Sequence, residues 1–298
     1  MKDTGMEKKR TGKSEEAIPD KFEKTGYLNS EFKIFHLTDH EPRDFNYHYH
    51  DFNKIILFIS GNVSYFIEGK SYQLKPYDII LVKAGEIHKP VIHDTLPYER
   101  IIIYISPDFF EAYKEDECDL ACCFLKAEEH CSNVLRMTEL GKEGLFESFL
   151  RLELSFHDDG FAHELYRKVL FLEFMITLNR VVLNKGIHYI DTNIANPKIL
   201  DIMRYINDNI SLDITIDSIA GCFFLNRSYL MHLFKAETGY TIGKYITEKR
   251  LFTAKSLMKN GSPITEACYN SGFKNYTTFF RAFKDKFQMS PKDAADYL

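Results

Sequence analysis

The stretch ITIDSIAGCFFLNRSYLMHLFKAETGY, residues 214–240, decides how the C-terminal third of the chain folds. Each of its halves carries apolar residues at the spacing of one helix face. These residues, expected in the core, are Ile216, Ile219, Ala220, Tyr229, Leu230, Leu233 and Phe234. Asn226 stands between the halves and is a good N-cap for the second helix. Two short helices joined this closely cross at a steep angle, which predicts a helix-turn-helix unit.

A second stretch of the same kind, SPITEACYNSGFKNYTTFFRAFKDKFQMSP, occupies residues 262–291. Ser262 and Pro263 suit the start of a helix, Gly272 the turn, and Asn275 the next N-cap. The residues expected on its inner faces are Ile264, Ala267, Cys268, Phe279, Ala282 and Phe283. Their spacing repeats that of the first unit, which indicates a weak internal duplication.

Residues 243–261, GKYITEKRLFTAKSLMKNG, form a third kind of helix between the two units. Its inner stripe is apolar, and its outside is dominated by Lys244, Lys249, Arg250, Lys255 and Lys259. A helix of about 17 residues spans roughly 25 Å. That length suits two recognition helices in successive major grooves on one face of the DNA, and therefore a long, non-palindromic site.

Together these segments resemble the DNA-binding domain of AraC/XylS-type transcription regulators, in the right order and spacing. The resemblance is carried by residues 218–239, 245–258 and 264–291. It implies an all-α DNA-binding domain with two helix-turn-helix units at residues 197–298. The chain departs from the usual pattern at Ala267-Cys268, Thr278 and Gln288, which leaves the preferred base sequence open.

In a helix-turn-helix unit the second helix enters the major groove with its N-terminal half toward the bases. The side chains expected to contact DNA are Arg227, Ser228, His232, Lys235, Lys274, Asn275, Tyr276, Thr277 and Arg281. Arginine reads guanine, asparagine reads adenine, and threonine contacts the thymine methyl group. Helix N-termini and the remaining lysines are expected to hold phosphates.

Charge is distributed unevenly along the 298 residues, whose formal net charge is −5. Residues 196–298 hold 14 Lys and Arg against 10 Asp and Glu, whereas the preceding residues hold 24 against 33. A basic C-terminal domain behind an acidic N-terminal one suits local contact with DNA phosphates. The sequence has no run long enough for a membrane span, no secretory signal and no cysteine framework, which predicts a cytoplasmic protein.

The N-terminal half starts with residues 1–25, which are polar, lack periodicity and are expected to be disordered. Residues 26–106 then carry short β-type runs separated by turn signals, as in an antiparallel barrel or double sheet. This region resembles the small-barrel cupin domain that precedes many AraC-type DNA-binding domains. The segments HYHDFNKIILFISG (48–61) and YQLKPYDIILVKAGEIH (72–88) carry that resemblance. The fold class predicted for the chain is therefore α+β, with an N-terminal cupin-like antiparallel β-barrel.

The cupin resemblance places His48, His50 and His88 at positions that ligate metal in many cupins, and Lys54 where those proteins have a glutamate. A cation at Lys54 replaces one anionic ligand, so we predict no resident metal or other cofactor. These four residues are instead the candidate effector site. A fixed charge on Lys54, with three imidazoles titrating near neutrality, favours an anionic or hydroxyl-rich effector. The alternative is that three imidazoles still bind zinc or a similar ion.

Residues 107–188 are expected to be helical and residues 189–196 to be a linker. The last long helix has more apolar surface than one domain face needs, as in the helical dimer interface of many relatives, which favours a homodimer. Its apolar residues are Leu165, Val169, Phe171, Leu172, Phe174, Met175, Ile176, Val182 and Leu183. Upstream, four cysteines gather near His130: Cys118, Cys122, Cys123 and Cys131. They are interpreted as ordinary half-buried thiols, with metal or redox sensing as the alternative.

The function these patterns favour is a sequence-specific transcription regulator, an activator as in most relatives, controlled by a small-molecule effector in the N-terminal domain. Its partners are double-stranded DNA, the effector, a second copy of the chain and RNA polymerase. It is not expected to be an enzyme, because no paired carboxylates or Ser-His-Asp pattern is present. Two alternatives stay open: a metal-dependent cupin enzyme fused to a DNA-binding domain, and a regulator controlled by a protein partner.

Overall fold

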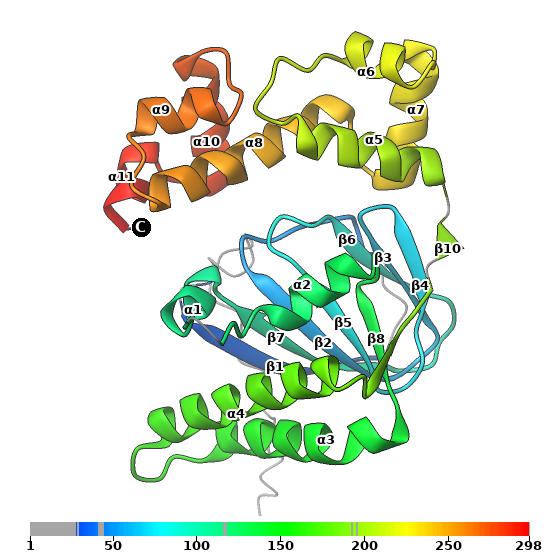
Figure 1. The fold of residues 1–298 in the computed structure, drawn as a ribbon, viewed down its shortest axis with the longest axis vertical. Coiled ribbons are helices and arrows are strands. Elements are labelled where there is room, and N and C mark those ends of the chain that lie inside the picture. Colours follow the sequence, from blue (N-terminus) through cyan, green and yellow to red (C-terminus); the bar gives the residue numbers. More distant parts are fainter. Residues whose placement is uncertain are drawn as a thin grey trace, which may run out of the picture.

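The computed structural model describes residues 28, 30–40, 45–115, 118–191, 193–194 and 196–297. The tail that was expected to be disordered, residues 1–25, lies outside this set. The chain folds into a sheet domain, residues 30–194, and a helical domain, residues 197–297 (Figure 1). This confirms the mixed architecture, with strands in the N-terminal part and helices in the C-terminal part. Within the described residues no helix is long and apolar enough to cross a membrane.

The sheet domain consists of two antiparallel sheets. One has the strand order β1-β7-β2-β5-β8-β9 and the other β10-β4-β3-β6. The strands are β1 (Phe32–Asp39), β2 (Asn53–Ser60), β3 (Val63–Ile67), β4 (Lys70–Gln73), β5 (Asp78–Val82), β6 (His88–Ile92), β7 (Tyr98–Ile105), β8 (Val134–Met137), β9 (Ile187–Tyr189) and β10 (Asn193–Ile194). The closed barrel expected from the sequence is not formed by the described residues. Among the described residues ahead of β2, a single bridge between His48 and His88 reaches the second sheet, which is too short to close it.

Alternation along β2 sorts its side chains between two cores. Ile55 and Leu57 belong to the core between the six-stranded sheet and the helices. Ile56 and Phe58 belong to the core between the two sheets. Lys54 lies two residues before Ile56, so its side chain points to the same face of the strand as Ile56 and Phe58. Its ammonium group therefore enters the space between the sheets.

Helices α1 (Pro107–Ala112), α2 (Cys122–Glu129), α3 (Glu139–Leu154) and α4 (His163–Leu183) pack on the outer face of the six-stranded sheet (Figure 1). The apolar residues of α4 fall into a buried group and an exposed group. Phe171, Phe174 and Met175 are buried, whereas Leu165 and Val169 are exposed. The exposed residues therefore contribute nothing to the core of this chain.

The segment expected to be helical, residues 107–188, is not helical throughout. Cys118 lies in a bridge with Glu115, α2 begins only at Cys122, and β8 follows it. The linker expected at 189–196 contains β10, which pairs with β4, while β9 just before it pairs with β8. Edge strands offer unpaired backbone groups to a passing chain, and such pairing needs no side-chain periodicity.

The helical domain begins directly after β10. Its elements are α5 (Pro197–Asp208), α6 (Ile216–Cys222), α7 (Arg227–Thr238), α8 (Ile242–Lys259), α9 (Ile264–Asn270), α10 (Tyr276–Phe287) and α11 (Pro291–Tyr297). Two helix pairs, α6–α7 and α9–α10, stand at either end of α8 (Figure 1). The expected N-caps are confirmed, since Asn226 accepts from the Ser228 amide and Asn275 from the Thr278 amide. Pro263 is itself the N-cap of α9, one position later than expected.

Each helix pair has its own apolar core. Leu230 and Phe234 lie in the first core, and Phe279 and Phe283 lie in the second. The prediction that Tyr229 belongs to the core was wrong, because 55% of its surface is exposed. Neighbouring positions on a helix point about 100° apart, so Tyr229 leaves the core while Leu230 enters it.

The two domains contact each other along α8, whose lysines do not all face solvent as the sequence indicated. Lys249 donates to Glu68 at 3.1 Å and to the Gly85 carbonyl at 2.9 Å. Lys255 binds Asp51 at 2.6 Å. A third ion pair joins Lys259 to Asp108. The acidic sheet domain thus binds much of the basic face of α8, and these cations are engaged within the chain in this arrangement.

Candidate functional site

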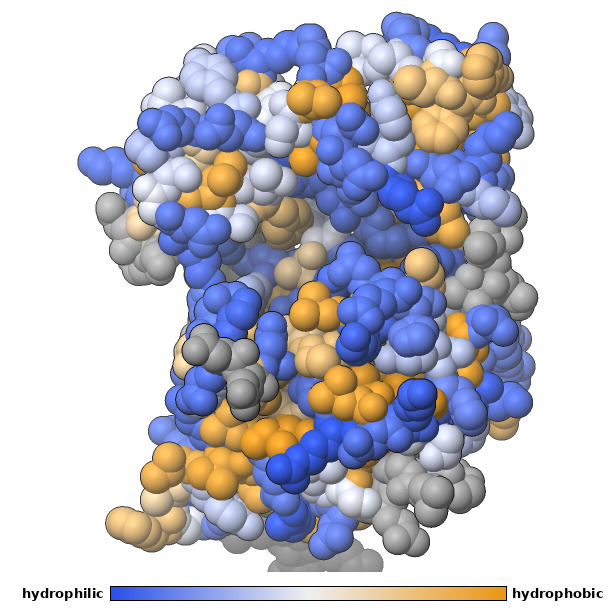
Figure 2. Space-filling model, viewed as in Figure 1, coloured by the Kyte–Doolittle hydropathy of each residue, from blue (hydrophilic) through white to orange (hydrophobic). Residues whose placement is uncertain are grey.

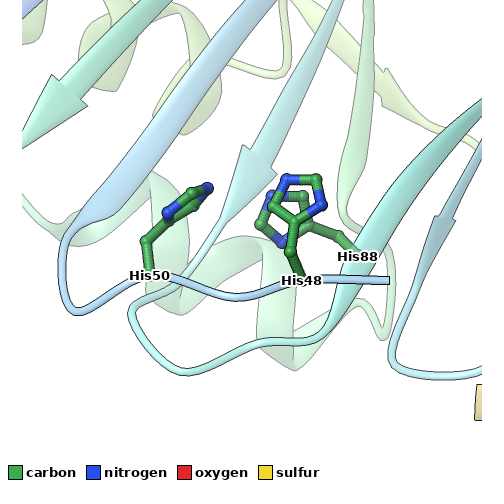
Figure 3. A group of neighbouring side chains, drawn as sticks. All are labelled: His48, His50 and His88. Atoms are coloured by element: carbon green, nitrogen blue, oxygen red, sulfur yellow. The ribbon is translucent and has the colours of Figure 1, made fainter. Parts of the chain in front are cut away.

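The three histidines that the sequence singled out lie together between the two sheets. His48 and His50 precede β2, and His88 begins β6 (Figure 3). The ring centroids of His48 and His88 are 4.4 Å apart, and those of His48 and His50 are 5.1 Å apart. One nitrogen from each ring lies within 4.8 Å of the others. Within the described residues this is the only group of three His, Cys, Asp or Glu side chains close enough to share an ion, and the cysteines form none.

Lys54 closes this cluster. Its ammonium nitrogen donates to His50 Nε2 at 3.0 Å and to His88 Nε2 at 2.9 Å. Only 4% of the lysine is exposed. Burial, helped by the positive charge of Arg100, lowers the pKa of Lys54 to about 7. The prediction of a fixed positive charge was therefore wrong, since this ammonium group titrates near neutrality.

The imidazoles are held as neutral hydrogen-bonding groups. His48 Nδ1 donates to the Asn46 carbonyl and His88 Nδ1 to the Glu86 carbonyl, both at 2.9 Å. Burial and the charge of Lys54 lower the pKa of His48 to about 4 and those of His50 and His88 well below the usual range. The expectation that all three titrate near neutrality was wrong, because burial disfavours their charged forms.

One ring nitrogen of His50 makes no hydrogen bond with the described residues. Its Nε2 accepts from Lys54, so its Nδ1 carries the proton. That Nδ1 is buried and has no hydrogen-bond partner among the described residues. A buried donor without a partner destabilises the fold by about 1–3 kcal/mol, so the site is poised to accept an oxygen atom from a ligand.

The residues present do not fit a bound metal ion. A metal needs the imidazole lone pairs, and Lys54 occupies two of the three. Its ammonium group also stands where an anionic ligand would be needed, and a divalent cation beside it would be repelled. The Lys54 ammonium group thus takes the place that a metal ion would have in this cluster.

Two further polar residues, Arg100 and Tyr104 of β7, lie on the same inner face. Arg100 is 6% exposed and its guanidinium group binds Asp39 at 2.7 Å. The Tyr104 ring lies 5.4 Å from the Lys54 ammonium nitrogen and 5.9 Å from the His50 ring. The space between the sheets therefore holds the basic side chains of Lys54 and Arg100, and Arg100 is paired with the carboxylate of Asp39.

The nine residues expected to contact DNA are all exposed. They lie on α7, on α10 and in the turn just before α10. Two of them are held by surface ion pairs, Arg227 with Asp217 and Lys274 with Asp213. The sequence assigned Tyr229 of α7 to the core, but its exposed ring shares this helix with Arg227, Ser228, His232 and Lys235.

Comparison with known proteins finds one family model for each part of the chain. The model of the AraC-like ligand binding domain matches residues 32–170, and that of a helix-turn-helix domain matches residues 219–296. The HTH-type transcriptional activator RhaS of Shigella sonnei is 23% identical over 258 residues, covering 85% of this chain and 90% of its own. RhaS of Enterobacter is 22% identical with the same coverage.

Two solved structures are also similar to this chain. ToxT from Vibrio cholerae covers 90% of this chain and 99% of its own at 18% identity, with a TM-score of 0.37. The C-terminal domain of AraT from Geobacillus stearothermophilus is 26% identical over 35% of this chain and 87% of its own, with a TM-score of 0.34. With both domain models matched in order and the RhaS relatives aligned across most of the chain, the protein belongs to the AraC-type transcription regulators.

Proposed function

We propose that this protein activates transcription from a specific DNA site when a small-molecule effector binds its sheet domain. The observation that carries the proposal is one chain that joins an AraC-like ligand-binding domain to a helix-turn-helix domain with exposed polar residues on α7 and α10. The proposal includes a cytoplasmic location, contact with RNA polymerase and no enzymatic activity. The sheet domain is taken as a cupin-type ligand-binding domain.

The DNA-binding mode rests on the two helix pairs. We take α6–α7 and α9–α10 as two helix-turn-helix units whose second helices enter successive major grooves. The 18 residues of α8 correspond to about 27 Å of helix, close to one turn of DNA. The chain then contacts a long site without internal symmetry.

Arg281 provides the test of base reading. Replacing Arg281 with alanine is expected to weaken binding to the target site by about 1–3 kcal/mol and to relax preference at one base pair. Thermal stability should hardly change, because the side chain is exposed. Titration of target and random DNA measures the effect, with Lys284→Ala, an exposed cation in the last turn of α10, as control. Equal losses on both DNAs would make Arg281 a phosphate contact.

The effector is proposed to be an anion or a hydroxyl-rich molecule bound at His48, His50, Lys54 and His88. Lys54 supplies an ammonium group whose charged form an anion would stabilise, and His50 Nδ1 supplies a buried donor without a partner among the described residues. Arg100 adds a second buried cation nearby. A carboxylate or a hydroxyl group is the ligand chemistry that these donors match.

Lys54→Glu tests this site in two ways. The variant is expected to abolish the transcriptional response to effector while DNA binding stays intact. It also restores a carboxylate beside three imidazoles, so affinity for zinc should rise by at least an order of magnitude. Reporter assays and competition with a zinc-binding dye measure these effects. Lys75→Glu, at an exposed position, is the control. A normal response in Lys54→Glu would place the effector elsewhere.

A homodimer is proposed through α3 and α4. Hydrophobic residues gather over the lower helices in Figure 2. The exposed ones are Leu150, Leu154, Phe161, Leu165, Tyr166, Val169, Ile176 and Leu183. An apolar face of this kind is typical of a surface that another helix covers. Sedimentation of the full chain tests the proposal, and a monomer at all concentrations would contradict it.

A further inference from the structure

The Lys54 nitrogen has the hydrogen-bond partners of a neutral amine. It is buried, and it donates to His50 Nε2 at 3.0 Å and to His88 Nε2 at 2.9 Å. Among the described residues it has no third acceptor, and the centre of the Tyr104 ring lies 5.4 Å away. An ammonium group has three hydrogens to donate, whereas two acceptors satisfy a neutral amine. The lone pair of the amine then occupies the third position.

The surroundings of Lys54 oppose a positive charge on this nitrogen. Burial, helped by the charge of Arg100, lowers the pKa of Lys54 to about 7. At pH 7.5 about three quarters of the Lys54 side chains are then neutral, against roughly one in a thousand ordinary lysines. A lysine amine that is desolvated beside another cation is an activated nucleophile. Lys54 therefore combines a free lone pair with a site that keeps it unprotonated.

Two features of the site select the reagent that this amine can take. The ring centroids of His48, His50 and His88 lie 4.4–5.3 Å apart, which leaves little room for a bulky molecule. The charge of Arg100, which disfavours a cation on the nitrogen, also favours an anion there. Carbon dioxide is small and uncharged, and its adduct with an amine is an anionic carbamate. Aldehydes and ketones are bulkier, and their protonated imines are again cations.

His50 can take the proton that carbamate formation releases. Its Nε2 accepts from Lys54, and its Nδ1 has no partner among the described residues. A proton can therefore enter at Nε2 and another can leave from Nδ1 without the loss of a hydrogen bond. His88 lacks this freedom, because its Nδ1 donates to the Glu86 carbonyl at 2.9 Å. His50 is thus the ring that can change its tautomer.

We propose that the Lys54 amine reacts with carbon dioxide to form a carbamate, which makes carbon dioxide the effector of this site. The lone pair of Nζ forms the bond to carbon, and one carbon–oxygen π pair moves onto oxygen. One Nζ proton passes to His50 Nε2, and the Nδ1 proton leaves to water. The remaining N–H donates to His88, and His50 Nε2–H donates to a carbamate oxygen. In naming the effector, the inference rests on the proposed function.

Covalent capture tests the carbamate in the full chain. The protein is incubated at pH 7.5 with isotopically labelled bicarbonate, which equilibrates with carbon dioxide, and carbamates are fixed by O-ethylation before peptide mass spectrometry. Capture at Lys54 is expected to exceed that at every other lysine by about tenfold or more. Lys249 is the internal comparison, because its side chain is only 17% exposed but its nitrogen binds Glu68 at 3.1 Å. Equal capture at both lysines overturns the proposal. So does bound label without capture at Lys54, which would mean bicarbonate held as an ion.

Two variants test the route of the proton. His50→Leu is expected to lower capture at Lys54 about tenfold, because the base that accepts from Nζ is lost. Lys249→Met, which removes a lysine outside the site, should leave capture at Lys54 unchanged. Unchanged capture in His50→Leu would overturn the role of His50.

Reporter assays at low and high carbon dioxide separate this inference from the proposed function. Capture at Lys54 without a transcriptional response would support the carbamate and contradict the effector role of the site. A response to another ligand that Lys54→Glu abolishes, with no capture at Lys54, would leave the effector site standing and overturn the carbamate.

Discussion

Replacing Phe234 with alanine is expected to lower the free energy of unfolding of the helical domain by about 3–5 kcal/mol. The ring is fully buried in the core of the first helix pair, 5.4 Å from the Tyr245 ring. Truncation removes its apolar contacts and leaves a cavity that close-packed neighbours fill only in part. The total free energy of unfolding of a domain is only about 5–15 kcal/mol. Much of the population should therefore be unfolded and unable to bind DNA.

Urea unfolding followed by circular dichroism measures the change. The control is Tyr229→Ala on the same helix, where 55% of the side chain is exposed and the expected change is within about 0.5 kcal/mol. Similar losses for both variants would mean that Tyr229 packs in the core after all. A small loss for Phe234→Ala would mean that the first helix pair is not an independent core.

Lys54 should make the stability of the protein depend on pH. Its folded-state pKa is about 7, against 10.5 as the ordinary value. Between these values the unfolded chain binds the proton and the folded chain does not, so stability rises with pH across this window. The slope approaches about 1.4 kcal/mol per pH unit for one group. Below pH 7 both states hold the proton and the contribution is flat.

The comparison with Lys54→Met isolates this effect, since the other titrating groups remain in both proteins. From pH 7 to pH 9 the wild type should gain roughly 2 kcal/mol relative to the variant, as measured by urea unfolding. A constant difference over this range would show that the buried ammonium group keeps its ordinary pKa.

The helical domain could be predicted because its signals are local. Asn226 and Asn275 cap helices whose apolar residues repeat within one or two turns. Tyr229 was misplaced because an apolar stripe read from sequence is wider than the face that packs. The pairing of β10 with β4 was missed because it depends only on where the chain passes an open sheet edge.

The sequence predicted which residues come together in the candidate site, but not their protonation states. Motif spacing brings His48, His50, Lys54 and His88 together, as the structure has them. Their protonation depends on burial by residues distant in the sequence, which spacing does not report. The sequence also did not predict that Lys249 and Lys255 contact the sheet domain. The pattern of charges on one helix does not show which acidic residues elsewhere in the chain will bind them.

The pairing of β10 with β4 limits how far the helical domain can travel. Ile194 is held in the sheet, and α5 begins at Pro197, so two residues connect them. The three Cα-to-Cα steps from Ile194 to Pro197 span about 10 Å when fully extended. A released helical domain is therefore tethered at a high effective concentration, in the millimolar range for short connections. Re-docking is then an intramolecular step whose equilibrium does not depend on how much protein the cell contains.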